Sequence, residues 1–349
     1  MAPFRVGLTK DFAPGGRLEG VLDRELVQML DGVPDLSYEF LTEYKPVVSA
    51  DQVSDFDFVI TGPSLWTEGS FRGLTRLAGV AYWGVGYDNI DVAAATESDV
   101  IVSITTPAVR RPMAESALAF MLALSKNMLI KDRLTREGRS DKKAQYNGIL
   151  IRDRVVGCIG LGNIGADFVR LLKPLDPVRI LVADPYLNRE RAVDAGVELV
   201  DLAGLLRDSD FVVVLCPLND ETNGMLGSEQ FRLMKKSAFL INVARGKIIK
   251  QAELTRALQE GWIKGAALDV FEDEPPDPED PILKLDNVIV TAHCIGWTEE
   301  AFRDNSVEDC RAAVSIYHGV PPAYTVNPAV LDRPRFREKL AAYAERGKS

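Results

Sequence analysis

Three apolar runs typical of buried strands each end in side chains that can do chemistry. These are Arg245 after residues 238–243, the acids Glu272, Asp273 and Glu274 after residues 265–270, and His293 after residues 287–291. A guanidinium group can hold the carboxylate of a 2-oxo acid through two hydrogen bonds. An imidazolium can give a proton to the carbonyl oxygen as hydride arrives, and a carboxylate on its far nitrogen orients the ring. Together, these groups suit the reduction of a 2-oxo acid by a hydride donor.

Each of these side chains also has a simpler interpretation. Arg245 could be a surface cation, the acidic loop could be solvated, and His293 could lie in an ordinary turn. Their combination at three strand ends favours a site, because ligands of open α/β sheets bind beyond the carboxyl ends of the strands. The residues alone do not choose among the three acids.

Histidine and cysteine usage narrows the chemistry further. The second of the two histidines, His318, precedes Gly319, as expected of a residue at a helix end without a chemical task. Two histidines exclude a multi-histidine metal site within one chain, and we expect no metal. The four cysteines form no Cys-x-x-Cys pair, which favours a reducing cytoplasm over a disulfide-bonded exterior.

A glycine-rich turn predicts a dinucleotide site. Residues 155–159 form a strand pattern that runs directly into Gly160, Gly162 and Gly165. In this spacing the first glycine permits a tight turn, and the second lets backbone amides approach a pyrophosphate. The third lets the following helix pack closely on the strand. Glycine-rich turns also occur for purely structural reasons, so the pattern needs a second signal.

The next predicted strand supplies that signal. Residues 179–183 end in Asp184, nineteen residues after Gly165, which is the spacing expected of the acid that binds a ribose 2′-hydroxyl. An acid before a proline at a strand end is common in itself, but here turn, strand and acid occur in the required order. Because a carboxylate repels the 2′-phosphate of NADP, we predict that the cofactor is NAD.

The elements that position these residues alternate between strands and helices. The strand patterns are apolar on both faces, which is typical of parallel sheets covered by helices. They cover residues 4–8, 56–60, 77–82, 100–104, 155–159, 179–183, 211–216, 238–243, 265–270 and 287–291. Helical patterns cover residues 164–172, 229–234, 251–260 and 298–318, and a single long helix is predicted over Met113–Arg139. The sequence therefore predicts two doubly wound α/β units joined by long helices.

The overall composition fits this class. The chain has 349 residues, enough for two domains, and its net charge of −10 argues against nucleic-acid binding. No apolar run reaches the length of a membrane span, and residues 1–5 lack the core of a signal peptide. We therefore expect a small-molecule substrate, no nucleic acid, no membrane and a cytoplasmic location.

Seven motifs resemble, in sequence and in order, the signatures of the D-isomer-specific 2-hydroxyacid dehydrogenases. They lie at residues 84–91, 114–115, 157–165, 217–222, 242–246, 267–275 and 287–293. The resemblance covers about residues 55–328 and implies a flavodoxin-like substrate domain and a Rossmann NAD-binding domain, with a cleft between them. It places the substrate domain at 1–103 plus 297–330, the NAD-binding domain at 104–296, and a C-terminal extension at 331–349. Family members usually dimerise through the nucleotide domain, so a homodimer is expected.

The same resemblance assigns roles to individual residues. It implies a catalytic group of Arg245, Glu274 and His293, and so chooses Glu274 among the three acids. Arg245 and His293 also contact the substrate, whose carboxylate is held by backbone amides near Val85 and Gly86. The cofactor-binding set is Gly160, Gly162, Asn163, Ile164, Gly165, Asp184, Pro217, and Asp269, which hydrogen-bonds the nicotinamide carboxamide.

Several residues depart from the family pattern and leave the substrate open. Tyr82 and Trp83 stand where phosphoglycerate-type relatives usually have Arg-Ala, which argues against a phosphorylated substrate. Arg110 and Arg111 are unusual in the loop expected before the long helix. They could bind a second anionic group of the substrate or be ordinary exposed arginines. Trp297 adds an aromatic side chain near the expected substrate mouth.

A second class of function is also compatible with the motifs. The C-terminal-binding-protein corepressors resemble this family and keep its catalytic residues, so the chain could instead be a non-enzymatic, NAD-sensing interaction protein. The chain shows no long disordered flank of the kind expected in a regulatory scaffold. Turnover of NADH with a small 2-oxo acid, compared with NADH binding alone, would separate the two functions.

Overall fold

The computed structural model describes residues 3–16, 18–20 and 24–346. The chain divides into two compact units. The second unit is Arg110–Trp297, and the first is formed by the chain before and after it. Each unit is built on one parallel sheet, which confirms the predicted fold class of two α/β domains. Residues 1, 2 and 347–349, which belong to the predicted substrate domain and extension, lie outside the described residues.

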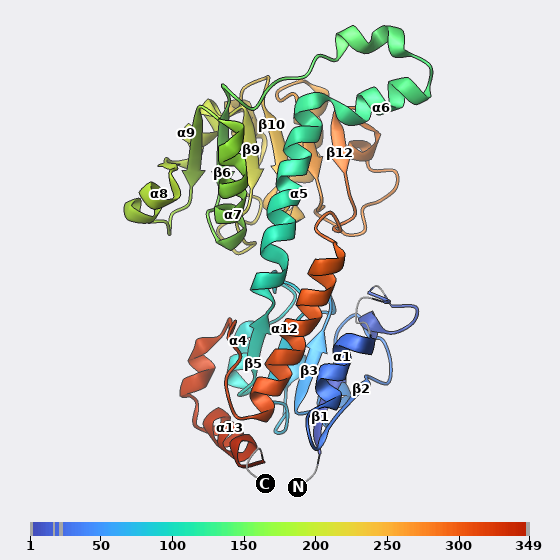
Figure 1. The fold of residues 1–349 in the computed structure, drawn as a ribbon, viewed down its shortest axis with the longest axis vertical. Coiled ribbons are helices and arrows are strands. Elements are labelled where there is room, and N and C mark those ends of the chain that lie inside the picture. The colour runs from blue at the N-terminus through green and yellow to red at the C-terminus, as the bar shows by residue number, and fades with distance from the viewer. Residues whose placement is uncertain (1–2, 17, 21–23, 347–349) are drawn as a thin grey trace. The chain divides into compact units, whose positions relative to one another are not determined.

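The first unit contains a five-stranded sheet in the order β2-β1-β3-β4-β5 (Figure 1). This order, which reverses between β1 and β3, is that of flavodoxin-like folds. The strands are β1 (Phe4–Leu8), β2 (Leu36–Phe40), β3 (Phe58–Thr61), β4 (Gly79–Tyr82) and β5 (Ile101–Ile104). β2 was not predicted, because this edge strand is half-exposed and carries polar residues instead of a continuous apolar run.

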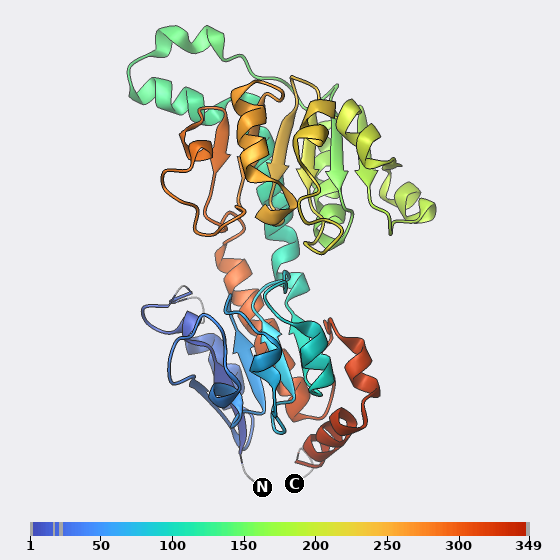
Figure 2. The same cartoon turned by 180° about the vertical axis from the view of Figure 1, so that it is seen from behind.

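Helices cover both faces of this sheet (Figures 1 and 2). Buried residues of α1 (Arg24–Asp31), α12 (Glu299–Tyr317) and α13 (Pro334–Arg346) share one core cluster with β1, β3 and β5. The other face is covered by α2 (Ala50–Val53), α3 (Glu68–Phe71) and α4 (Val92–Glu97). His318 is the C-cap residue of α12, as predicted.

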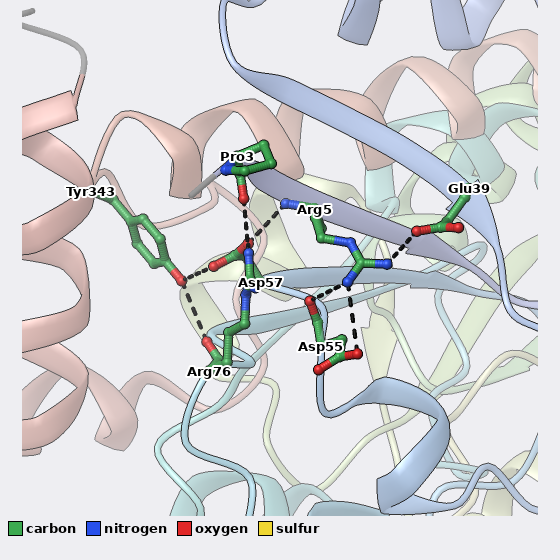
Figure 3. Close-up of polar contacts among 7 residues, drawn as sticks. All are labelled: Pro3, Arg5, Glu39, Asp55, Asp57, Arg76 and Tyr343. Carbon is green, nitrogen blue, oxygen red and sulfur yellow. Dashed lines mark hydrogen bonds and ion pairs between the residues drawn. The ribbon is translucent and has the colours of Figure 1, made fainter. Parts of the chain in front are cut away.

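A buried carboxylate ties α13 to the amino end of this sheet (Figure 3). Asp57, which is 2% exposed, precedes β3 and accepts hydrogen bonds from the Arg5 amide at 2.8 Å and from Arg76 Nη2 at 2.6 Å. Its other oxygen accepts the Tyr343 hydroxyl of α13 at 2.8 Å. Arg76 also donates to the Pro3 carbonyl oxygen. The described part of the predicted extension, residues 331–346, therefore packs on the first unit.

The second unit contains a seven-stranded sheet in the order β12-β11-β10-β9-β6-β7-β8. The order reverses between β6 and β9, which is the switch point of a Rossmann fold and the place where dinucleotides bind. The strands are β6 (Val155–Ile159), β7 (Arg179–Ala183), β8 (Glu198–Leu199), β9 (Phe211–Val214), β10 (Phe239–Asn242), β11 (Gly265–Leu268) and β12 (Val288–Val290). The two-residue β8 was not predicted, because it is too short to give a pattern.

Two helical layers cover this second sheet. One core cluster contains residues of α5 (Thr106–Lys126), α7 (Asn163–Leu172) and α8 (Arg189–Ala195). The opposite cluster contains residues of α9 (Leu202–Asp208), α10 (Ser228–Leu233) and α11 (Gln251–Gln259). Because both faces are buried, the parallel strands have the continuous apolar sequences on which the prediction rested.

The prediction of one long helix over Met113–Arg139 was wrong. α5 starts at Thr106, contains Pro112 inside it, and ends at Lys126; α6 (Met128–Arg136) follows at an angle of 58°. Asn127 breaks the helix, because it adopts a left-handed conformation with φ of +50° that an α-helix cannot contain. Among the described residues no single helix is long and apolar enough to cross a membrane; only this bent pair passes that test, and only jointly.

Candidate active site

The glycine-rich turn between β6 and α7 has the geometry that a dinucleotide needs. Gly160 has a φ of +92°, and a Cβ atom there would lie 2.9 Å from the Cys216 backbone. Gly162 is the N-cap of α7, and a Cβ atom on it would meet nothing within 4 Å. A Cβ on Gly165 would lie 3.0 Å from the Gly160 carbonyl oxygen. The turn therefore presents open backbone at a helix N-terminus, where N–H groups and the helix dipole favour a phosphate.

The predicted ribose acid is bound to this turn. Asp184 follows β7, and its Oδ2 accepts a hydrogen bond of 2.9 Å from the Leu161 amide. Its Oδ1 accepts the Tyr186 amide, also at 2.9 Å. Asn163 and Ile164, which were assigned to the cofactor, are the first two residues of α7. A half-buried carboxylate beside an open glycine turn is the donor and acceptor set that NAD requires, so these residues fit that cofactor.

Pro217 lies in the loop after β9, which pairs with β6 on the side opposite β7. Its carbonyl oxygen accepts the Thr222 hydroxyl at 2.7 Å. Asn219 Oδ1 accepts the amides of Glu221 and Thr222, each at 3.0 Å. These bonds form a local turn of the kind that asparagine favours. The loop thus has a defined shape at the carboxyl end of β9.

His293 and Glu274 lie in direct contact. His293 Nδ1 is 2.7 Å from Glu274 Oε2, and the other carboxylate oxygen accepts the Phe271 amide at 3.0 Å. Burial raises the pKa of Glu274, but the hydrogen bond and charge of His293, the Phe271 amide and the charge of Arg245 together lower it below its ordinary value. Glu274 is therefore held as an anion that orients the imidazole, and Nε2 is the ring nitrogen that can exchange a proton with a substrate.

The other two candidate acids are placed differently. Glu272 Oε2 accepts the Gln251 amide at the start of α11, and the Glu272 amide donates to Gln251 Oε1. Asp273 is exposed. Of the three acids left open by the residues alone, Glu274 is the one whose side chain contacts the His293 ring.

Arg245 is held by a residue to which the sequence analysis gave no role. Asn242, the fully buried last residue of β10, donates through Nδ2 to the Arg245 carbonyl oxygen at 2.9 Å and accepts the Ala244 amide at 3.0 Å. Gly246 brings this turn against the acidic loop, because a Cβ there would lie 1.8 Å from the Phe271 carbonyl oxygen. A polar residue within an apolar strand was the signal that could have revealed Asn242.

Asp269 organises the loop that carries His293. Its Oδ1 accepts the Thr291 hydroxyl at 2.6 Å and the amides of Cys294 and Ile295 at 3.0 and 3.1 Å. The Asp269 carbonyl oxygen accepts the His293 amide at 2.7 Å. His293 itself has a φ of +55°, an uncommon backbone conformation that concentrates at functional sites. The role of Asp269 toward a nicotinamide carboxamide stays a prediction.

Helix α5 braces the same loop. The buried Ser116 hydroxyl donates to the Ile295 carbonyl oxygen at 2.9 Å and lies 2.7 Å from the Pro112 carbonyl oxygen. A Cβ on Gly296 would lie 2.3 Å from Met113 Sδ, so the loop passes the helix closely. These two contacts were not predicted, because α5 and the loop are far apart in the sequence.

The two predicted arginines differ in their surroundings. Both lie inside α5 and not in the expected loop. Arg110 Nη2 is 3.0 Å from Oδ1 of the buried Asp167 of α7, whereas Arg111 pairs with Glu115 one turn later. Burial raises the pKa of Asp167, but its hydrogen bonds with Arg110 and Arg170 lower it by more. Arg110 therefore links α5 to α7, which the interpretation as a substrate-binding arginine did not foresee.

Val85 and Gly86 belong to the first unit, after β4. Gly84, with φ of +140°, lies at the start of this loop, and its amide donates a 2.9 Å hydrogen bond to Oγ1 of Thr105, which directly follows β5. Thr105 in turn hydrogen-bonds Asn305 of α12. Trp83 packs on Phe302, with ring centroids 5.5 Å apart. The predicted substrate amides thus lie on a loop fixed by its own unit.

Comparison with known proteins decides the family. The model of the D-isomer specific 2-hydroxyacid dehydrogenase, NAD binding domain, matches residues 118–294. The chain belongs to this family. The match confirms the predicted resemblance, the NAD cofactor and the class of NAD-dependent oxidoreductase acting on a CH–OH group.

Two curated relatives illustrate the similarity. A D-3-phosphoglycerate dehydrogenase of Archaeoglobus fulgidus is 39% identical over 70% of this chain and 46% of its own length. A glyoxylate reductase of Korarchaeum cryptofilum is 38% identical over 75% of this chain and 79% of its own. The match thus spans less than half of the first relative, and neither name settles the substrate here.

Solved structures of this dehydrogenase fold agree in architecture. A glyoxylate reductase from Paecilomyes thermophila has a TM-score of 0.81 at 22% identity and covers 93% of this chain and 98% of its own. A D-lactate dehydrogenase from Aquifex aeolicus, complexed with NAD and lactic acid, has a TM-score of 0.81 at 24% identity and covers 92% and 99%. These likenesses support the fold alone.

Proposed function

We propose that this dehydrogenase reduces a small 2-oxo acid to the 2-hydroxy acid at the expense of NADH. The observation that carries the proposal is the 2.7 Å contact between His293 Nδ1 and Glu274 in the same unit as the open glycine turn. An imidazole oriented by a carboxylate is a proton donor, and the family's cofactor domain supplies the reductant.

Each residue of the site has a distinct task in this proposal. The nicotinamide cofactor, when bound to the glycine turn, would supply the hydride as NADH or accept it as NAD⁺. Glu274 accepts the Nδ1 hydrogen of His293, so that Nε2 holds the proton that is passed to the substrate oxygen. Arg245 binds the carboxylate and polarises the carbonyl. Backbone amides near Val85 and Gly86 hold the substrate carboxylate, which gives the first unit its substrate-binding role. In the oxidative direction, neutral His293 accepts the hydroxyl proton.

The test is consumption of NADH by purified protein with a panel of 2-oxo acids. The panel contains glyoxylate, hydroxypyruvate, pyruvate, and branched, aromatic and dicarboxylic 2-oxo acids. Turnover of at least one of them, lost in His293→Ala, is the expected result. Tight NADH binding without turnover of any of them would overturn the proposal and favour an NAD-sensing interaction protein.

We also propose that the protein is a homodimer formed through the second unit. Figure 1 shows α6 and the segment after it extending away from the sheet of that unit. Met128, Leu129 and Leu150 on this arm are 54%, 51% and 63% exposed, which is apolar surface that a second copy would cover. Light scattering should show a dimer in the wild type and a monomer in Leu129→Asp with Leu150→Asp. Val320→Asp, at a similarly exposed residue of the first unit, should stay dimeric.

A reducing compartment such as the cytoplasm is proposed for the protein. The four cysteines, all among the described residues, form no disulfide with one another, and two of them, Cys158 and Cys310, are buried. Burial raises the pKa of both thiols to about 12, which keeps them as inert apolar side chains. Full activity without added thiol reductant, and no disulfide detected in freshly lysed cells, is the expected outcome.

A further inference from the structure

A hydrogen bond crosses the carboxyl end of β6. Tyr186 lies two residues beyond Asp184, after β7, and Glu221 lies in the loop after β9. The Tyr186 hydroxyl donates to Glu221 Oε2 at 2.8 Å. In the sheet, β6 lies between β7 and β9. The bond therefore joins the two loops that flank the glycine turn, at the switch point where a dinucleotide binds.

Both ends of this bridge are anchored. The Tyr186 amide donates to Asp184 Oδ1, the acid whose other oxygen is bonded to the glycine turn. The Glu221 amide donates to Asn219 Oδ1 in the local turn after Pro217. The hydrogen bond and charge of Glu221 raise the pKa of Tyr186, so the phenol remains a donor. Tyr186 is 75% exposed, so its ring is not part of the hydrophobic core and has surface left to cover a ligand.

The bridge also adds negative charge beside the ribose acid. Asp184 and Glu221 approach from opposite sides of β6, and Asp220 adjoins Glu221. The adenosine ribose of NAD carries a 2′-hydroxyl, from which Asp184 can accept a hydrogen bond. The same position of NADP carries a phosphate with nearly two negative charges. Repulsion between charges a few ångströms apart is about 1 kcal/mol for each pair even in water, or roughly a factor of five in affinity.

We propose that Tyr186 and Glu221 form a strap over the adenosine half of the cofactor site, and that the charge of Glu221 acts with Asp184 to exclude NADP. The proposal rests on the family's NAD-binding domain and is independent of which 2-oxo acid is the substrate. Tyr186 supplies the cover, and Glu221 supplies both its hydrogen-bond acceptor and the discriminating charge.

Two substitutions separate the cover from the charge. Glu221→Gln keeps an oxygen that can accept the Tyr186 hydroxyl but removes the charge. Tyr186→Phe removes the hydrogen bond but leaves the charge. Glu229→Gln, at an exposed residue of α10 in the same unit, is the matched control, because it changes the net charge equally. Dissociation constants for NADH and NADPH are measured by fluorescence titration without any 2-oxo acid, and circular dichroism checks folding.

We expect Glu221→Gln to tighten NADPH binding roughly fivefold to thirtyfold while NADH binding changes by less than about threefold. Tyr186→Phe should weaken both cofactors together and speed NADH release in stopped-flow measurements, with the NADH/NADPH preference unchanged. Added salt should narrow the NADH/NADPH preference in the wild type, and should narrow it less in Glu221→Gln, where the charge of Asp184 remains but that of Glu221 is lost.

The strap is overturned if Glu221→Gln has the same NADH/NADPH preference as Glu229→Gln. It is equally overturned if Tyr186→Phe releases NADH at the wild-type rate. A wild-type protein that binds NADH but turns over no 2-oxo acid would contradict the proposed reaction while leaving this cofactor measurement fully decisive.

Discussion

His293 Nδ1 lies 2.7 Å from Glu274 Oε2, although nineteen residues separate them. The contact depends on backbone hydrogen bonds that hold each partner independently. The His293 amide donates to the Asp269 carbonyl oxygen, and Glu274 accepts the Phe271 amide through its second oxygen. Because Asp269 and Phe271 are two residues apart after β11, one short segment positions both the histidine and its carboxylate.

Replacing His293 by Gln should lower kcat for 2-oxo acid reduction by roughly 10²–10⁴-fold, the usual range for loss of a general acid. NADH affinity should change little, since the glycine turn and Asp184 are untouched. His318→Gln is the matched control, because His318 caps α12 in the first unit and has no assigned chemistry. Steady-state kinetics measure both variants. Equal loss in the two variants would mean that the effect is structural.

Glu274→Gln should lower kcat for 2-oxo acid reduction by roughly tenfold or more. Glu274 has a lowered pKa and is an anion across the neutral range, and its carboxylate holds the Nδ1 side of the His293 ring. The amide keeps an oxygen at that position but removes the charge that supports the ring during proton transfer. Steady-state kinetics and NADH titration measure the effect, and NADH affinity should stay unchanged. A variant with the kcat of the wild type would contradict this role.

The sequence predicted the two parallel-sheet units, and the elements that it missed have physical causes. The bounds of β1, β6 and β7 agree with the prediction to the residue, and each of these mainly apolar strands is followed by a polar residue or a glycine: Thr9, Gly160 and Asp184. The break at Asn127 was missed, because a left-handed residue leaves no mark in an amphipathic pattern.

Contacts between distant segments were equally hidden. The choice of Glu274 among three acids depends on a contact with His293 that only the folded loops create. Gly246 matters because the Phe271 loop passes against it, and Ser116 matters because α5 meets the Ile295 carbonyl oxygen. The resemblance to the family had already singled out Glu274, but the contacts of Gly246 and Ser116 join distant segments and could not be read from the sequence.

Ser116→Ala should lower kcat roughly tenfold with unchanged NADH affinity, because the loop carrying His293 loses one of its braces and small displacements of catalytic groups are costly. Ser125→Ala is the control. Ser125 is also buried in α5, but its hydroxyl bonds only within the helix, to the Leu122 carbonyl oxygen, among the described contacts. Kinetics and NADH titration of both variants check the prediction, and similar kcat values for the two would refute it.

Asp309 should make the first unit less stable as pH rises. It is 1% exposed on α12, and neither side-chain oxygen has a hydrogen-bond partner among the described residues. Burial raises its pKa well above 3.8, so the folded state holds the proton longer than the unfolded state does. The free energy of unfolding is therefore highest at pH values below the pKa that Asp309 has in the unfolded chain. As pH rises above that pKa it falls, by up to about 1.4 kcal/mol per pH unit, until the carboxyl group ionises in the folded state as well.

Asp309→Asn removes this titration without changing the side-chain shape. The free energies of unfolding of the wild type and the variant are measured with denaturant at about every pH unit between roughly pH 4 and 8. The variant should be the more stable protein, by a margin that grows as pH rises. Parallel pH dependences of the two proteins would show that Asp309 is not protonated in the fold.

The network around Asp57 links the two segments of the first unit that lie before and after the second unit in the chain. Arg5 and Tyr343 bond the same carboxylate, and Phe4 packs edge-on against the Tyr343 ring. The second unit lies wholly between these segments, so a nascent chain can complete it while the first unit still lacks α12 and α13. During translation, therefore, the first unit starts before the second unit and is completed after it.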